Sequence, residues 1–274
     1  MFFRPPETDT VPIDKELLMR PLHVLQTLLL TFLMAGLQPA LAEPAPGQTS
    51  PKPKVIFFDV NETLLDLESM RQSVGAALGG RQDLLPLWFS TMLHHSLVES
   101  ATEQYHDFGT VGTAALLMVA RNNGIALTEQ QARSAIVPPL LRLPAHPEVR
   151  EGLQALKNRG YTLVTLTNST RRGVQTQLEN AGLADLFADN LSIEEIKLYK
   201  PHLRTYRWAA ERMGVKLEET LLVAAHGWDV AGAKAAGMPA IFVARPGQTL
   251  YPLAAEPDRT VKDIRELAEV LGSR

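Results

Sequence analysis

The chain has 274 residues and no cysteine, and its 27 Lys and Arg against 30 Asp and Glu give a formal net charge of -3. Without cysteine, a disulfide scaffold, a thiolate zinc site and a cysteine nucleophile are excluded. A charge so close to balance argues against a nucleic-acid partner, because affinity for phosphates needs clustered Lys and Arg. The hydrophobic fraction of 45% excludes a wholly disordered chain, and the length suits one or two domains.

Residues 1–42 have the features of a secretory signal peptide. The apolar stretch His23–Leu37 follows Arg20 and precedes Ala40–Ala42, a small-x-small sequence that signal peptidase accepts. Acidic residues before Met19 do not suit a signal peptide, so the true start is expected at Met19. We expect cleavage after Ala42, a periplasmic or secreted protein, and only transient membrane contact. The alternative is an uncleaved N-terminal membrane anchor, although a span needs about 20 apolar residues.

After a linker at 43–53, rich in Pro, Gly and Ser, short apolar runs alternate with helix-period segments. The predicted strands are Val55–Phe58, Tyr161–Leu166, Thr220–Ala224 and Ala240–Val243. The predicted helices are Pro147–Arg159, Arg171–Ala181, Leu203–Met213 and Val230–Ala236, each followed by a glycine suited to a left-handed C-cap. Uninterrupted apolar strands are typical of a parallel sheet covered on both faces. The pattern predicts an α/β fold with a doubly wound parallel sheet.

Residues 68–144 interrupt this alternation. They contain no strand pattern, but they show helical periodicity at Leu84–Val98 and Val111–Asn122. We expect a helical cap domain inserted after the first strand, with Pro138-Pro139 and Pro144–Pro147 marking its return to the core. The core domain would then comprise residues 54–67 and 145–274.

Polar side chains follow the apolar strands, where ligands bind in an open α/β sheet. They are Asp59, Thr167, Asn168, Lys200 and Asp229. Asp59 comes directly after the first strand, so we expect a partly desolvated carboxylate near loop N–H groups. Such a carboxylate suits a nucleophile.

Four segments resemble, in order, the motifs of the haloacid dehalogenase superfamily: FFDVNETLLD, LTNST, LYKP and AAHGWD. The resemblance covers about residues 54–271 and includes a helical cap at the expected insertion point. It implies that Asp59 is the nucleophile and that Thr167 and Asn168 hold the anionic group of the substrate. Lys200 would neutralise charge, and Asp229 would orient Lys200.

Two departures separate the chain from the phosphatases of this superfamily. Those enzymes carry a second Asp two residues after the nucleophile, where this chain has Asn61, and an amide cannot act as a general acid. Their last motif also carries an additional Asp near Ala225, and this chain has none there. Only Asp59 and Asp229 therefore remain to bind Mg²⁺, which prefers several hard oxygen ligands. We therefore expect no cofactor. A Mg²⁺-dependent phosphatase using these two carboxylates stays an alternative, as does a non-catalytic binding protein.

The spacing from Lys200 to Tyr206 and the pair Trp228-Asp229 resemble the 2-haloacid dehalogenase branch. That resemblance implies a small 2-halogenated carboxylic acid as substrate, an aspartyl-ester intermediate and hydrolysis of the ester. It places Tyr206 beside the lysine near the substrate carboxylate, with Asn61 also at the substrate. A homodimer is a further expectation.

The last motif and the cap depart from that branch. Its cap arginine, which helps hold the halide, corresponds to Phe89 here, and its serine and asparagine in the last motif become Ala224 and His226. His226 has a side chain that titrates near neutrality, so it could help activate water for ester hydrolysis at the substrate site. The alternative is a structural histidine that binds a loop.

Overall fold

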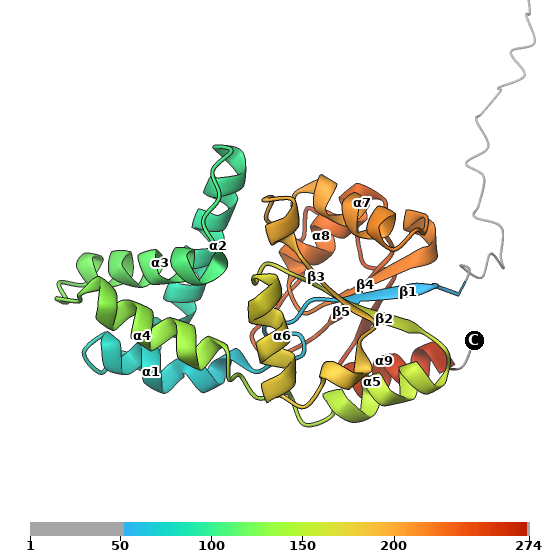
Figure 1. The fold of residues 1–274 in the computed structure, drawn as a ribbon, viewed down its shortest axis with the longest axis horizontal. Helices are drawn as coiled ribbons and strands as arrows, with labels where there is room; N and C mark the ends of the chain where they lie inside the picture. The colour runs from blue at the N-terminus through green and yellow to red at the C-terminus, as the bar shows by residue number, and fades with distance from the viewer. Residues whose placement is uncertain (1–51, 273–274) are drawn as a thin grey trace, which may run out of the picture. The chain divides into compact units, whose positions relative to one another are not determined.

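The computed structural model describes residues 52–272 and shows a six-stranded parallel sheet in the order β3-β2-β1-β4-β5-β6 (Figure 1). The predicted signal peptide and most of the linker lie outside the described residues. The reversal of strand order occurs beside β1, whose neighbours are β2 and β4. The strands are β1 (Val55–Phe58), β2 (Thr162–Thr167), β3 (Asp189–Ser192), β4 (Thr220–Ala224), β5 (Ala240–Val243) and β6 (Arg259–Val261).

Helices cover both faces of the sheet. Ile56 and Phe58 pack in one core with helices α5 (Val149–Asn158), α6 (Arg171–Asn180) and α9 (Ile264–Gly272). Val55 and Phe57 point to the other face and pack with α7 (Leu203–Arg212) and α8 (Gly227–Ala236). All four side chains of β1 are buried, which explains why this strand lacks polar alternation. The predicted doubly wound α/β fold is confirmed.

The four predicted strands and four predicted core helices are present, with small shifts at their ends. The glycines that follow the helices do adopt positive φ, for example 92° at Gly237. Strands β3 and β6 were not predicted, because these edge strands are short and carry polar residues such as Asp189 and Arg259. Helix α9 was not predicted either. Short 3-10 turns at Leu67–Met70, Gln82–Leu84, Ala184–Leu186, Ile193–Glu195 and Leu217–Glu219 complete the described elements.

The inserted segment is entirely helical. It contains α1 (Arg71–Ala77), α2 (Leu85–Ala101), α3 (Phe108–Asn122) and α4 (Glu129–Leu140). A bridge between Leu65 and Ala145 joins the chain leaving the core to the chain returning to it, beside the predicted boundaries. Of the prolines expected at the return, Pro138 and Pro139 lie inside the last turn of α4 instead. Their fixed φ suits a helix, and burial of Ile136 and Leu140 holds this turn against the cap core. Pro144 does lie at the return, where its carbonyl accepts from the backbone N–H of Asp66.

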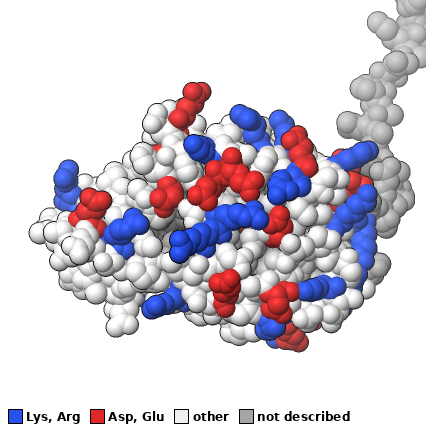
Figure 2. All heavy atoms as spheres, in the orientation of Figure 1, with Lys and Arg blue, Asp and Glu red and all other residues white. Residues whose placement is uncertain are grey.

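Among residues 52–272, none of the helices is long and apolar enough to span a membrane. Figure 2 shows Lys and Arg interleaved with Asp and Glu on the face in view. Mixed charge of this kind does not make the one-signed basic surface that binds a phosphate backbone.

Candidate active site

Three charged residues from the motifs meet in a buried cluster at the carboxyl end of the sheet. Lys200 Nζ donates to Oδ1 of Asp59 at 2.9 Å, to Oδ2 of Asp229 at 2.6 Å and to the carbonyl of Leu166 at 2.9 Å. Asp59, Lys200 and Asp229 are 5%, 1% and 0% exposed. All three ammonium protons have acceptors, so Lys200 offsets the charge of both carboxylates at once.

The cluster fixes the ionisation of its members. Burial alone would raise the pKa of the Asp59 carboxyl, but the Lys200 ammonium and hydrogen bonds from His226 and Thr63 lower that pKa far below its usual value. Burial opposes the charge on Lys200, yet Asp229 and Asp59 raise the pKa of Lys200. Burial raises the pKa of Asp229, and Lys200 opposes that rise. At neutral pH Asp59 is therefore an ionised carboxylate beside an ammonium.

The loop after β1 places a hydroxyl on the second oxygen of Asp59. Thr63 Oγ1 donates to Asp59 Oδ2 at 2.7 Å and accepts from the backbone N–H of Ala225 at 2.9 Å. The Arg245 guanidinium holds the Thr63 carbonyl through bonds of 3.2 and 2.8 Å and pairs with the buried Glu148 at 2.7 Å. The loop is thus fastened to β4 and to the start of α5.

His226 lies between two carboxylates. Its Nδ1 is 3.2 Å from Asp59 Oδ2, and its Nε2 is 2.6 Å from Glu62 Oε2. Burial disfavours the imidazolium, but these two hydrogen-bonded carboxylates raise the pKa of His226 to about 9. Both ring nitrogens therefore donate at neutral pH. Glu62 reaches the ring from a left-handed backbone, with φ of 62°, which non-glycine residues seldom adopt.

The asparagines of the motifs hold the loops that carry the charged residues. Asn61 Oδ1 accepts from Gln177 Nε2 at 2.9 Å, and Asn61 Nδ2 contacts Ser169 Oγ at 3.5 Å. Asn168 Oδ1 accepts from the backbone N–H of Lys200 at 3.0 Å. These bonds tie the loops after β1, β2 and β3 into one rim around Asp59.

Thr167 ends β2, and its hydroxyl accepts from the backbone N–H of Ser169 at 3.1 Å. This bond shapes the turn that presents Asn168. Thr167 is therefore placed at the predicted edge of the sheet, where it supports the loop.

Tyr206 shares the Asp229 carboxylate with Lys200. Its hydroxyl donates to Asp229 Oδ1 at 2.6 Å, and the side chain is completely buried among α7 and α8. A Cβ at Gly232 on α8 would collide with Tyr206 and Pro201, so glycine there permits this close packing. Tyr206 thus lies behind Asp229.

Phe89, at the position of the halide-binding arginine, does reach the site from the cap. Its ring centroid lies 6.0 Å from that of His226, which in turn stacks on Trp228 at 5.0 Å. These three rings and Glu62 line a cavity of about 310 Å³ between cap and core, together with Leu67, Glu68, Leu85, Pro86, Ser90, Leu93, Pro246, Gly247 and Gln248. The cavity suits a small molecule.

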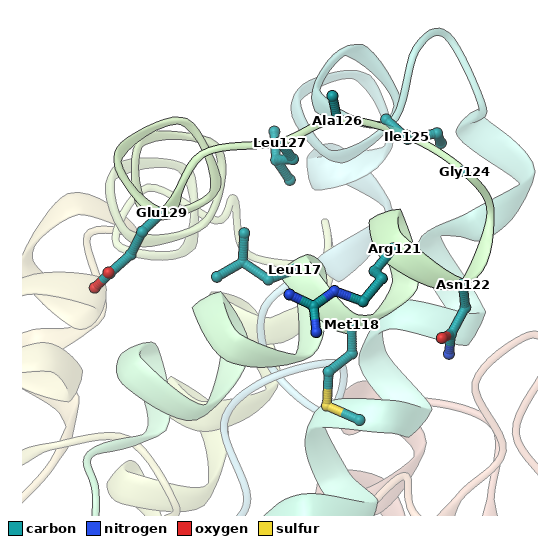
Figure 3. Close-up of a pocket in the computed structure, with 9 residues that line it drawn as sticks. All are labelled: Leu117, Met118, Arg121, Asn122, Gly124, Ile125, Ala126, Leu127 and Glu129. Carbon is teal, nitrogen blue, oxygen red and sulfur yellow. The ribbon is translucent and has the colours of Figure 1, made fainter.

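None of the three charged motif residues lines the cavity of about 310 Å³, which adjoins Asp59 through His226, and other hollows lie elsewhere. One of about 490 Å³ is lined by core residues such as Ser169 and Gln177 and by cap residues such as Phe108. Figure 3 shows another, of about 850 Å³, on the cap around the end of α3, lined by Leu117, Met118 and neighbouring residues. None of the motif residues lines this second hollow.

The residues present do not fit a Mg²⁺ ion. The described part of the chain contains no group of three His, Asp or Glu side chains arranged to hold a metal. Both oxygens of Asp229 are engaged, one by Lys200 and one by Tyr206. A hard divalent cation needs several free oxygen ligands, which Asp59 and Asp229 do not supply here.

No role was predicted for Glu62 or Thr63, although Thr63 contacts Asp59 and Glu62 contacts His226. Thr63 lies inside the first motif, four residues after Asp59, so the loop itself was a usable signal. Glu62 lies in the same motif, but its partner His226 is 164 residues away in the chain, so no local pattern links the two.

Comparison with known proteins agrees with this architecture. The family model of haloacid dehalogenase-like hydrolases matches residues 53–237. An (S)-2-haloacid dehalogenase from Pseudomonas sp. (strain YL) is 30% identical, over 79% of this chain and 94% of the relative, and haloacetate dehalogenase H-2 from Moraxella sp. (strain B) is 30% identical over 77% and 94%.

Among solved structures, an L-2-haloacid dehalogenase from Xanthobacter autotrophicus with chloropropionic acid covalently bound superimposes with a TM-score of 0.75. The identity is 25%, and the match covers 80% of this chain and 98% of that one. The family match, the relatives of similar sequence and the solved structure thus all span most of the part of the chain that carries the core and the cap. The chain belongs to the haloacid dehalogenase-like hydrolase family.

Proposed function

We propose that this protein is a hydrolytic dehalogenase of small 2-halogenated carboxylic acids. Asp59 attacks C2 of the substrate, the halide leaves, and the resulting aspartyl ester is hydrolysed to the 2-hydroxy acid. The observation that carries the proposal is the state of Asp59, an ionised and nearly buried carboxylate beside the Lys200 ammonium. Desolvation of this kind makes a carboxylate a stronger nucleophile.

The site favours carbon–halogen displacement over phosphoryl transfer. A departing halide is a stable anion that needs no proton, whereas a departing alkoxide needs a general acid. The residue placed to serve as that acid is Asn61, an amide whose two polar atoms already face Gln177 and Ser169. The two carboxylates are engaged by Lys200, so a metal-assisted route finds no ligand set.

The substrate class follows from the cavity and from the relatives. The cavity of about 310 Å³ beside His226 admits a short carboxylic acid, and its apolar walls, among them Phe89 and Leu93, suit an alkyl group. The relatives with similar sequence carry the names (S)-2-haloacid dehalogenase and haloacetate dehalogenase. We therefore assign haloacetates and (S)-2-halopropionates as the substrates.

The test is halide release in the absence of added metal. The purified protein is incubated with (S)-2-chloropropionate or chloroacetate, with EDTA or with Mg²⁺, beside Asp59→Asn. We expect the unmodified protein to release halide equally with EDTA and with Mg²⁺, and Asp59→Asn to release none above background. Release of phosphate from p-nitrophenyl phosphate that depends on Mg²⁺, without halide release, would contradict it.

The export signal and the assembly state are separate proposals. The apolar stretch and the Ala40–Ala42 site support cleavage after Ala42 and a periplasmic location. N-terminal sequencing of material from a periplasmic fraction should then begin at Glu43.

For the homodimer, light scattering of the purified protein should give twice the mass of one chain.

A further inference from the structure

The two oxygens of the Asp59 carboxylate have different surroundings. Oδ1 accepts one hydrogen bond, from Lys200 at 2.9 Å. Oδ2 accepts two, from Thr63 Oγ1 at 2.7 Å and from His226 Nδ1 at 3.2 Å. A carboxylate oxygen has about two acceptor sites, so only Oδ1 keeps one open. Oδ1 is therefore the oxygen that attacks the substrate, and Oδ2 becomes the carbonyl oxygen of the ester.

Hydrolysis of that ester places negative charge on Oδ2. When water attacks Cγ of Asp59, the carbonyl becomes a tetrahedral oxyanion, and donors already aimed at it lower the barrier. We propose that Thr63 and His226 form the oxyanion hole for this step, with Glu62 holding the His226 ring in position. The proposal rests on the function proposed above and assigns the second chemical step, hydrolysis of the ester, to these side chains.

The ring of His226 is fixed on three sides. Glu62 Oε2 accepts from Nε2 at 2.6 Å, and the other oxygen of Glu62 accepts from Gln248 Nε2 at 3.1 Å. Trp228 stacks on the ring with an interplanar angle of 22°, and Phe89 packs near it from the cap. Nδ1 is thereby held toward Oδ2 before any charge develops, which is what a preorganised donor requires.

The charge on Asp59 changes during the catalytic cycle, and for this reason His226 assists ester hydrolysis rather than the attack on the substrate. The charged groups that face the ring are Asp59 and Glu62. In the free enzyme the imidazolium stabilises the Asp59 carboxylate and so restrains its attack. In the ester Asp59 is neutral, and its charge returns only in the tetrahedral state. His226 then stabilises the transition state more than the ester, the condition for catalysis.

The step balances without further reactants. The water oxygen bonds to Cγ, the Cγ–Oδ1 bond breaks, and Oδ1 departs in the 2-hydroxy acid with a proton from the Lys200 ammonium, its hydrogen-bond partner. Lys200 recovers a proton from the new carboxylic acid of Asp59, whose hydroxyl oxygen came from water. The other water proton is released, so haloacid and water give hydroxy acid, halide and one proton.

The test separates the two chemical steps in His226→Phe, which keeps an aromatic ring between Trp228 and Phe89 but cannot donate. In single-turnover reactions, with enzyme in excess over (S)-2-chloropropionate, halide release measures the rate of alkylation. Reactions with excess substrate measure steady-state turnover, and mass spectrometry of the Asp59 peptide detects the ester. His226→Gln, a neutral donor, is measured in parallel. His94→Phe, on the exposed face of α2, is the matched control.

We expect His226→Phe to release one halide per site at least as fast as the unmodified enzyme and then to stall. Turnover should fall about a hundred- to a thousand-fold, the loss typical of one oxyanion-hole donor, with the ester accumulating on Asp59. The turnover of His226→Gln should lie between that of His226→Phe and that of the unmodified enzyme, and the turnover of His94→Phe should equal that of the unmodified enzyme. Because a variant that still alkylates is folded, the halide burst is its own folding control.

Two results would overturn the inference. The first is unchanged turnover in both His226→Phe and His226→Gln. The second is an equal loss of halide burst and turnover in His226→Gln, because that would place the ring in the alkylation step. If His226→Phe does not fold, His226→Gln decides by the same criteria. Absence of halide release from the unmodified enzyme would instead count against the proposed function. The two failures are therefore distinct.

Glu62 is tested as a positioning residue through Glu62→Gln, which can still accept from the ring but lacks charge. We expect a near-normal halide burst and slower ester hydrolysis. The hydrolysis rate should also decline at lower pH than in the unmodified enzyme, because the variant releases the ring proton more easily. An unchanged pH profile would contradict this role.

Discussion

The Tyr206 hydroxyl donates a 2.6 Å hydrogen bond to Oδ1 of Asp229, and both side chains are completely buried. Lys200 binds the opposite oxygen of the same carboxylate at 2.6 Å. Asp229 is thus clamped from two sides and in turn directs the ammonium toward Asp59. Tyr206 supports this chain of contacts from behind and makes none with the cavity at His226.

Tyr206→Phe removes only that hydroxyl. We expect kcat to fall several-fold while KM for the haloacid stays within about a factor of two, because the tyrosine acts through Asp229. The free energy of unfolding should drop by about 1–3 kcal/mol, the cost of a lost buried bond to a charged group. Steady-state kinetics and urea denaturation check both. Tyr251→Phe, at an exposed site, is the control, and a large rise in KM would instead place Tyr206 at the substrate.

Lys200→Met leaves Asp59 and Asp229 buried without their shared cation. Breaking a buried ion pair in this way costs about 3–5 kcal/mol, so we expect a matching loss in the free energy of unfolding. Halide release should fall at least a thousand-fold, a loss on the order seen for catalytic residues. Lys216→Met, whose side chain is 76% exposed, should change stability by less than about 0.5 kcal/mol. Comparable stability of the two variants would refute the ion-pair argument.

Thr63→Val replaces the hydroxyl that bridges Asp59 and Ala225 with a methyl group of similar size. It leaves the Ala225 N–H without an acceptor, at an expected cost of about 1–3 kcal/mol in unfolding free energy. Ester hydrolysis should slow about a hundred-fold, because one oxyanion donor is lost. Thr63→Ser keeps the donor and should restore most of the activity. Equal rates in the two variants would show that the hydroxyl is not needed.

Arg245→Met tests the fastening of the loop after β1. The guanidinium donates to the Thr63 carbonyl and pairs with Glu148, which would be left buried and charged. We expect a loss of about 3–5 kcal/mol in unfolding free energy. Arg207→Met, at an exposed position on α7, is the matched control, and denaturation in urea measures both.

The His226 ring gives stability its own pH dependence. Its pKa is 6.5 as a free side chain and about 9 in the folded protein. Because the pKa is higher in the folded state, protonated His226 stabilises the folded protein fully below pH 6.5, and this stabilisation is lost as the pH rises through 9. The difference in unfolding free energy between the unmodified protein and His226→Gln should therefore shrink by roughly 3 kcal/mol between pH 6.5 and 9. Denaturation curves across this range measure it, and a difference that grows with pH would contradict the assignment.

Much of the fold could be predicted from local features of the sequence. Val55–Phe58 carries four apolar residues in a row, which only a strand covered on both faces accommodates, and Asp59 follows it directly. Periodicity and a following glycine predicted the core helices α5, α6, α7 and α8, but not α9. Strand β3, with Asp189 and Asn190, could not be identified, because an edge strand needs neither apolar alternation nor burial on both faces.

By itself, the sequence determined the class of chemistry: a carboxylate after a buried strand, a lysine in a later loop, and an amide where a general acid would be needed. Only the tertiary structure decided which side chains touch. It brought Glu62 to His226 across 164 residues and turned Tyr206 toward Asp229. The reason is physical: hydrogen bonds between distant segments depend on how loops after different strands converge, and no local pattern records that convergence.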